Sequence, residues 1–110
     1  MADKKKVIPW VADATKAVLA VHRLQGQRYG WPLFQLHAWH LEPAGTGDRL
    51  RLYLGESQVI VEGLLLQTIV DDLERGHGGV LCEQGERFAS LAQPGELWVS
   101  TITVHQPGEI

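Results

Sequence analysis

The sequence predicts an α+β domain: a small, mainly antiparallel β-sheet or partly open barrel with one principal amphipathic helix, at about residues 64–75, covering one face. The main observation is a change of hydrophobic period within residues 48–76. Residues 49–54 alternate between polar and apolar side chains, a Gly-Glu-Ser turn and a β-rich run follow, and the apolar positions then take the 3.6-residue period of a helix. The best-formed strands are also two-faced, which is typical of an antiparallel sheet with one solvated face.

The length and composition of the chain are those of one globular domain. One hundred and ten residues are enough to bury one hydrophobic core, and a hydrophobic fraction of 45% with a charged fraction of 21% is ordinary for a folded protein. We expect a flexible, basic N-terminal arm over residues 1–12, a single α+β domain over residues 13–106 and a C-terminal tail over residues 107–110.

The sequence predicts a cytoplasmic protein that does not enter a membrane. No apolar run approaches the roughly 18 residues that a spanning helix needs. The apolar stretch after the first lysines is broken by Pro9 and is too short for a signal peptide. The single cysteine, Cys82, cannot form an intramolecular disulfide, which fits a reducing compartment.

The first element of the domain is ambiguous. Residues 14–24 are compatible with a helix because of their alanine content, and with a strand because residues 18–21 are apolar and partly β-branched. A tight turn at residues 25–27 and the aromatic-rich run 28–31 follow, so we predict a β-hairpin.

The middle of the chain is expected to form one helical turn and three strands. Pro32 interrupts the second strand and can start a single turn over residues 33–36. Residues 37–41 are a third strand, residues 42–48 form the clearest loop, and residues 49–62 form the hairpin described above.

The helix that follows is expected to cover the sheet with one apolar stripe. Its stripe residues are Leu65, Leu66, Ile69, Val70 and Leu73. The acidic residues Asp71, Asp72 and Glu74 lie away from the centre of this stripe, which is typical of a solvated face. Gly76 suits the left-handed position after a helix, so the helix is expected to end there.

The last third of the chain is expected to add strands to the sheet. Residues 76–79, which are rich in glycine, are predicted to be a flexible link. Residues 80–83 and 87–91 are predicted to form a hairpin, and residues 97–104 are a convincing strand with alternating faces.

No catalytic or metal-binding motif is recognisable in the sequence. His37 and His40 could bind one ion from a helix, but on a strand residues three apart point to opposite faces. Cys82 is followed by Glu83, and an acidic neighbour raises the pKa of a thiol, so a buried core cysteine is expected. We therefore predict no catalytic residue, no metal and no cofactor. A small hydrolase or metal enzyme built on His37, His40 and Cys82 is the least favoured alternative.

The tryptophans point to a protein partner. The chain has four tryptophans but only two phenylalanines and two tyrosines, and one covering helix is not expected to hide all four. Tryptophan is enriched at interfaces. We therefore predict a non-enzymatic protein-interaction or self-associating domain that uses Trp10, Trp31 and Trp39 together with an uncovered sheet face.

A nucleic-acid-binding module is the alternative. The net charge is −3, but basic residues are concentrated in the first 41 positions and acidic residues in the remainder. The residues that could form a basic surface are Lys4, Lys5, Lys6, Lys16, Arg23 and Arg28. Three of these lysines lie in the predicted flexible arm, where a solubilising tail is the simpler interpretation, so nucleic acid is the less favoured partner.

Overall fold

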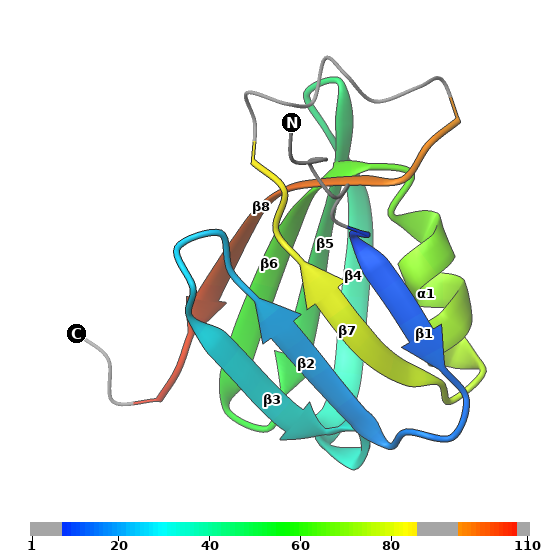
Figure 1. Ribbon diagram of the computed structural model, residues 1–110, viewed down its shortest axis with the longest axis vertical. Helices are drawn as coiled ribbons and strands as arrows, with labels where there is room; N and C mark the ends of the chain where they lie inside the picture. Colours follow the sequence, from blue (N-terminus) through cyan, green and yellow to red (C-terminus); the bar gives the residue numbers. More distant parts are fainter. Residues whose placement is uncertain (1–7, 86–94, 108–110) are drawn as a thin grey trace, which may run out of the picture.

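Two four-stranded β-sheets lie face to face, with one α-helix at the side between them, in the computed structural model, which describes residues 8–85 and 95–107 (Figure 1). The strands, in chain order, are β1 (Trp10–Asp13), β2 (Val18–His22), β3 (Arg28–Pro32), β4 (Leu36–Ala44), β5 (Gly47–Leu54), β6 (Ser57–Leu64), β7 (Gly78–Cys82) and β8 (Trp98–His105). A 3-10 turn, η1 (Leu33–Gln35), joins β3 to β4, and the helix α1 (Gln67–Glu74) follows β6.

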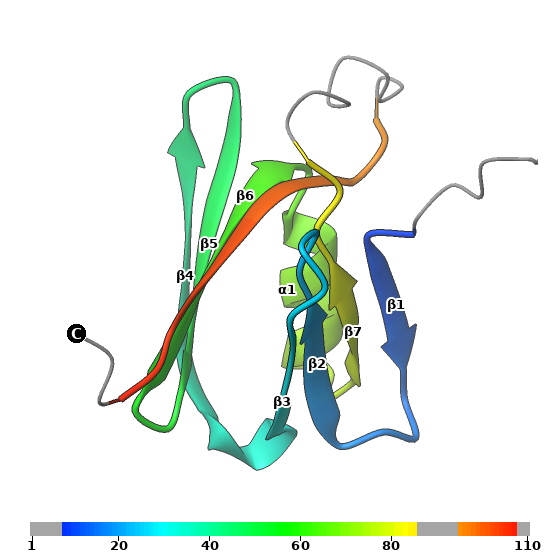
Figure 2. The same ribbon diagram turned by 60° about the vertical axis from the view of Figure 1, so that its left-hand side comes forward.

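The strand order is β1-β7-β2-β3 in the first sheet, called sheet A below, and β4-β5-β6-β8 in the second, sheet B. All neighbouring strands are antiparallel except β2 and β7, which are parallel. The α+β class and the mainly antiparallel pairing agree with the sequence prediction. The predicted single sheet or partly open barrel does not, because the strands form two sheets that are not closed into a barrel (Figure 2).

Sheet B is built on the alternating segment around residues 49–54. Its strand β5 buries one leucine at every second position, and all three are at most 1% exposed: Leu50, Leu52 and Leu54. The intervening arginines and tyrosine point to the opposite face. The predicted loop 42–48 is shorter than expected, because β4 continues to Ala44, β5 starts at Gly47, and Pro43 pairs with Asp48.

Sheet A contains the hairpin that the sequence left ambiguous. Residues 14–24 do not form a helix: β2 pairs antiparallel with β3, and its Leu19 and Val21 are fully buried. The single turn after Pro32 is confirmed as η1. Residues 10–12 do not belong to a flexible arm, as the sequence predicts, but lie in β1, because β7 offers them an edge with which to pair.

The predicted flexible link at residues 76–79 is wrong in its second half. Gly78 and Gly79 are buried in β7, between β1 and β2. A Cβ atom on Gly78 would meet the carbonyl oxygens of Lys16 and Val18, and one on Gly79 would meet the backbone of β1. Glycine at these two positions therefore lets the backbones beside β7 approach it closely. Both edges of β7 are paired. The second arm of the predicted hairpin, residues 87–91, lies outside the described residues.

The helix begins later than predicted, at Gln67, and ends where predicted. Leu65 has a positive φ of 56° and is 45% exposed, so it belongs to the turn before α1 and not to its apolar stripe. The Leu66 amide, just before the helix, donates to Asp48 Oδ2 at 3.3 Å. At the other end, the Gly76 amide donates to the backbone carbonyl of Leu73, the His77 amide donates to the backbone carbonyl of Asp72, and Gly76 has φ 79°. This is the pattern of a Schellman motif.

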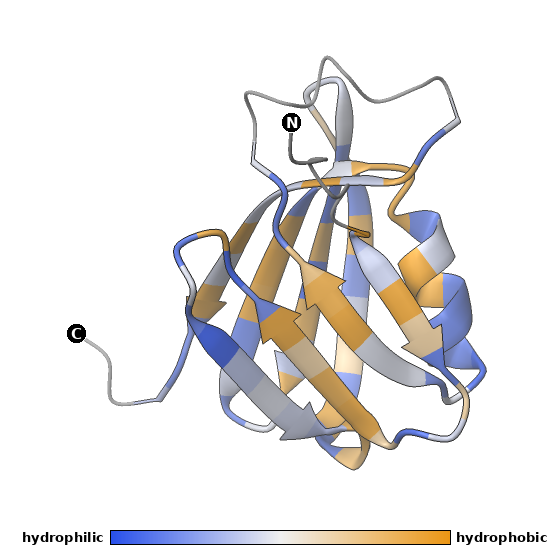
Figure 3. Cartoon of the chain, in the orientation of Figure 1, coloured by the Kyte–Doolittle hydropathy of each residue, from blue (hydrophilic) through white to orange (hydrophobic). Residues whose placement is uncertain are grey.

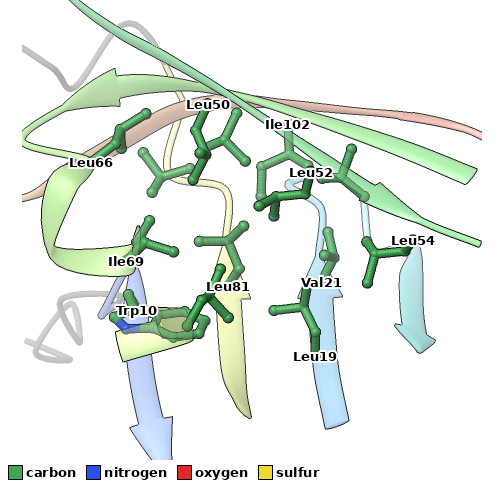
Figure 4. Packing of buried hydrophobic residues seen from close by; sticks show 14 of the residues in the cluster. Trp10, Leu19, Val21, Leu50, Leu52, Leu54, Leu66, Ile69, Leu81 and Ile102 are labelled. Carbon is green, nitrogen blue, oxygen red and sulfur yellow. The ribbon is translucent and has the colours of Figure 1, made fainter. Parts of the chain in front are cut away.

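The hydrophobic core lies between the two sheets and the helix. Side chains from β2, β5, β7, β8 and α1 meet there (Figure 4), and the strands of both sheets carry many apolar residues (Figure 3). Ile69, Val70 and Leu73 of α1 are at most 6% exposed. The helix thus fills the side of the sandwich between β1 and β4, where both sheets end (Figures 1 and 2).

Candidate interaction surface

Two of the three tryptophans predicted at a partner surface are buried. Trp10 and Trp31 are each 7% exposed, and Trp98 is 6% exposed, whereas Trp39 on β4 is 39% exposed. The predicted exposure of Trp10 and Trp31 is therefore wrong. One covering helix could not hide these rings, but the second sheet supplies a much larger interior.

Specific contacts hold the two buried rings in place. The Trp10 indole donates to Asp72 Oδ2 at 2.7 Å, which ties β1 to the helix. Trp31 faces the core opposite Leu19 and stacks on Tyr29, with ring centroids 6.0 Å apart and planes 7° apart. Both tryptophans are thus structural side chains of sheet A.

The outer face of sheet A is an uncovered apolar surface. The strand register places Val11, Val80, Ala20 and Gly30 in one row that crosses all four strands. The next row contains Gly78, Val18 and Pro32. Val11 is 47% and Val18 is 46% exposed. No helix or strand of the described residues lies over this face, which is turned to the viewer in Figures 1 and 3.

Polar residues lie at the two ends of this apolar surface. Asp13 of β1 is at one end, in register with Gly78. Cys82, His22 and Arg28 form the row at the other end. Cys82 Sγ lies 3.9 Å from His22 Nδ1. Partial burial raises the pKa of the Cys82 thiol, an effect that the Arg28 charge opposes. The cysteine is thus half-buried on the outer face and is not the core residue that the sequence predicted.

The outer face of sheet B has the opposite character, because it is charged. Arg49 lies between Glu42 and Glu62 of the neighbouring strands, 3.2 Å and 3.0 Å from their carboxylate oxygens. These hydrogen bonds raise the pKa of Arg49, with Glu62 as the larger cause. His40 and Arg51 also approach Glu42, at 3.5 Å and 3.7 Å. Charged and polar side chains are typical of a sheet face that contacts water. The apolar outer face of sheet A departs from this pattern.

The prolines of the described residues lie in or beside the edge strands of the two sheets. Pro9 precedes β1, Pro32 ends β3, Pro43 lies within β4 and Pro107 follows β8. Proline lacks the amide that an added strand would need, so it discourages the pairing of another chain with these edges.

The other candidate residues do not converge on one site. His37 and His40 lie on β4, where His37 Nε2 is 3.1 Å from the Gly55 carbonyl. No group of three or more potential metal ligands occurs among residues 8–85 and 95–107. In α1, Asp72 is engaged by Trp10 and Arg75, so it is not merely solvated as predicted.

The basic residues of the nucleic-acid alternative are also separated. Lys16 lies in the turn before β2, whereas Arg23 and Arg28 lie at the opposite end of the β2–β3 hairpin. Arg23 is 3.7 Å from Glu83. Lys4, Lys5 and Lys6 lie outside the described residues.

The sequence predicted an uncovered sheet face, but not which residues form it. It is formed mainly by small or β-branched residues of all four strands of sheet A, Val18 and Ala20 of β2 among them. The alternation of β2 is visible in the sequence, but only the register of β7 between β1 and β2 brings the strands into one surface. Within the described residues, no helix is long and apolar enough to span a membrane.

Comparison with known proteins returns no match: no family model fits the sequence, and no curated protein or solved structure is significantly similar to it.

Proposed function

We propose that this chain is a non-enzymatic protein-interaction domain that binds another protein surface through the outer face of sheet A. The observation that carries the proposal is the apolar row Val11–Val80–Ala20–Gly30, which crosses the whole sheet without a covering layer in the described part of the chain. Burying apolar surface contributes about 25 cal/mol per Å², so such a face favours a partner that covers it.

The small side chains of this surface suit a flat partner. Sheets pack face to face at about 10 Å, and glycine, alanine and valine leave room for a second layer at that spacing. The prolines of the edge strands disfavour the other common mode, in which a partner strand extends a sheet. Trp39 lies on sheet B, away from this surface, and is not part of the proposed contact.

Photo-crosslinking in the cells that make this protein tests the proposal. A photo-reactive side chain at Val11 or Val18 should give adducts of one discrete mass. The same side chain at Thr103, an exposed position of β8 opposite Ile60 on the outer face of sheet B, is the matched control. A second substitution, Ala20→Glu, should abolish the adducts, because it places a charge in the centre of the apolar row. Absence of adducts from Val11 and Val18, or equal adducts from Thr103, would refute the proposed function.

A further inference from the structure

We infer that the protein that covers the outer face of sheet A is a second copy of this chain, bound with the strands of the two sheets crossed at nearly a right angle. The inference rests on the proposed function and names the partner. It is drawn from the outline of the apolar surface and from the positions of the two charged residues at its corners.

The two charges occupy opposite corners of the surface. Asp13 is on β1, one edge strand, at the end where Gly78, Val18 and Pro32 lie in register. Arg28 is on β3, the other edge strand, and its register partner His22 marks the opposite end. An acidic and a basic residue thus lie on one diagonal of the outer face, with apolar residues between them.

The outline of the surface is nearly square. Its width is three spacings between neighbouring strands, about 14 Å at roughly 4.8 Å each. Its length, from the row of Asp13 to the row of Arg28, is four residues, about 13 Å at roughly 3.3 Å each. A square face matches a copy of itself when the two sheets cross at a right angle, which is one of the two common ways in which sheets pack.

Two-fold symmetry then pairs the charges. When the axis lies between the two sheets and perpendicular to the diagonal, Asp13 of each copy meets Arg28 of the other, so the contact forms twice, as in any isologous dimer. The apolar rows of the two copies face each other between these pairs.

Asp13 is suited to accept such a contact. Hydrogen bonds from the Thr15 hydroxyl and amide lower the pKa of Asp13, and the charge of Lys16 in the same turn lowers it further, so the carboxylate is ionised at neutral pH. Both hydrogen bonds, at 2.6 Å and 2.9 Å, are accepted by Oδ1. Arg28 is exposed at the other corner.

Charge reversal with mixing tests this arrangement on the full chain. Asp13→Lys alone, or Arg28→Glu alone, puts two like-charge contacts into the homodimer, so each should weaken self-association by about tenfold or more in sedimentation velocity. In an equimolar mixture of the two variants, the introduced lysine of one copy faces the introduced glutamate of the other, and the remaining Asp13 and Arg28 form the second pair. A heterodimer should therefore form with nearly the affinity of the unaltered protein. Thr103→Lys and Thr103→Glu, on the other sheet, are controls that should leave the dimer unchanged, and circular dichroism checks that every variant folds.

Each other result would overturn the inference. If the unaltered chain stays monomeric at every concentration at which it is soluble, no second copy binds. If it dimerises but the mixture does not associate better than either variant, the paired corners are wrong. If the photo-crosslinked adducts from Val11 contain a different protein, the inference fails while the proposed function stands.

Discussion

Asp72 shows how one side chain of the helix fixes the position of a strand. Its carboxylate accepts the indole N–H of Trp10 across 62 residues of sequence, and it also pairs with Arg75 at 3.4 Å. The sequence suggested only that Asp72 lies away from the apolar stripe. Its partner could not be predicted, because Trp10 was expected in a flexible arm.

For this single residue, we predict that Asp72→Ala destabilises the domain by about 1–3 kcal/mol, because it leaves the indole N–H of a buried tryptophan without its acceptor. Asp72→Asn keeps an acceptor oxygen and should recover part of this loss. Asp71→Ala removes an exposed contact to Gln67 and should stay within about 0.5 kcal/mol. Urea unfolding followed by tryptophan fluorescence measures all three, and equal losses for Asp71 and Asp72 would contradict the role given to Asp72.

Among the secondary-structure elements, α1 is held in place by a short buried apolar stripe and by hydrogen bonds at its two ends. Ile69 is fully buried, but Leu65, assigned to the same stripe by its spacing, is 45% exposed. The spacing was misleading because the left-handed backbone of Leu65 interrupts the helix before its first turn. The end at Gly76 was predictable, because a glycine after the last apolar position is a local signal.

We predict that Ile69→Ala costs about 2–5 kcal/mol of stability, because it opens a cavity between the helix and the sheets. Leu65→Ala should cost clearly less, since nearly half of that side chain already contacts water. Chemical denaturation of the two variants compares the same kind of truncation at two positions four residues apart. A loss at Leu65 as large as that at Ile69 would mean that the helix begins earlier than the structure shows.

At the scale of the whole molecule, Glu83 and Gln84, which follow β7, join the two sheets. Glu83 accepts the Leu24 amide at 2.8 Å from the β2–β3 turn and the Ile102 amide at 3.0 Å from β8. Gln84 exchanges two hydrogen bonds with Val99 of β8. One short stretch of chain therefore ties sheet A to sheet B.

We predict that Glu83→Ala destabilises the domain by about 3 kcal/mol, because two amides lose a charged acceptor. Glu83→Gln retains only one acceptor oxygen and should fall between the alanine variant and the unaltered chain. Glu56→Ala, in the exposed β5–β6 turn, is a control that should change stability little. Hydrogen exchange should show faster opening at both Leu24 and Ile102 in Glu83→Ala. Faster exchange at only one of them would mean that Glu83 does not join the sheets.

The elements that could be predicted from the amino-acid sequence are those whose signals are local. The alternation of residues 49–54, the strand at residues 97–104 and the helix end at Gly76 depend on neighbours a few positions away, and all three are present in the structure. Such patterns also show which side of each strand is apolar.

Which apolar sides are covered depends on the packing of distant segments. The insertion of β7 between β1 and β2 joins segments 60 to 71 residues apart, and periodicity carries no information on such distant pairings. That insertion buries Trp10 against α1, while Trp31 faces sheet B and the valines of sheet A remain exposed. The candidate interaction surface is therefore the outer face of sheet A and not the tryptophans. A hydrophobic period shows that a face needs covering, but it does not show what covers it.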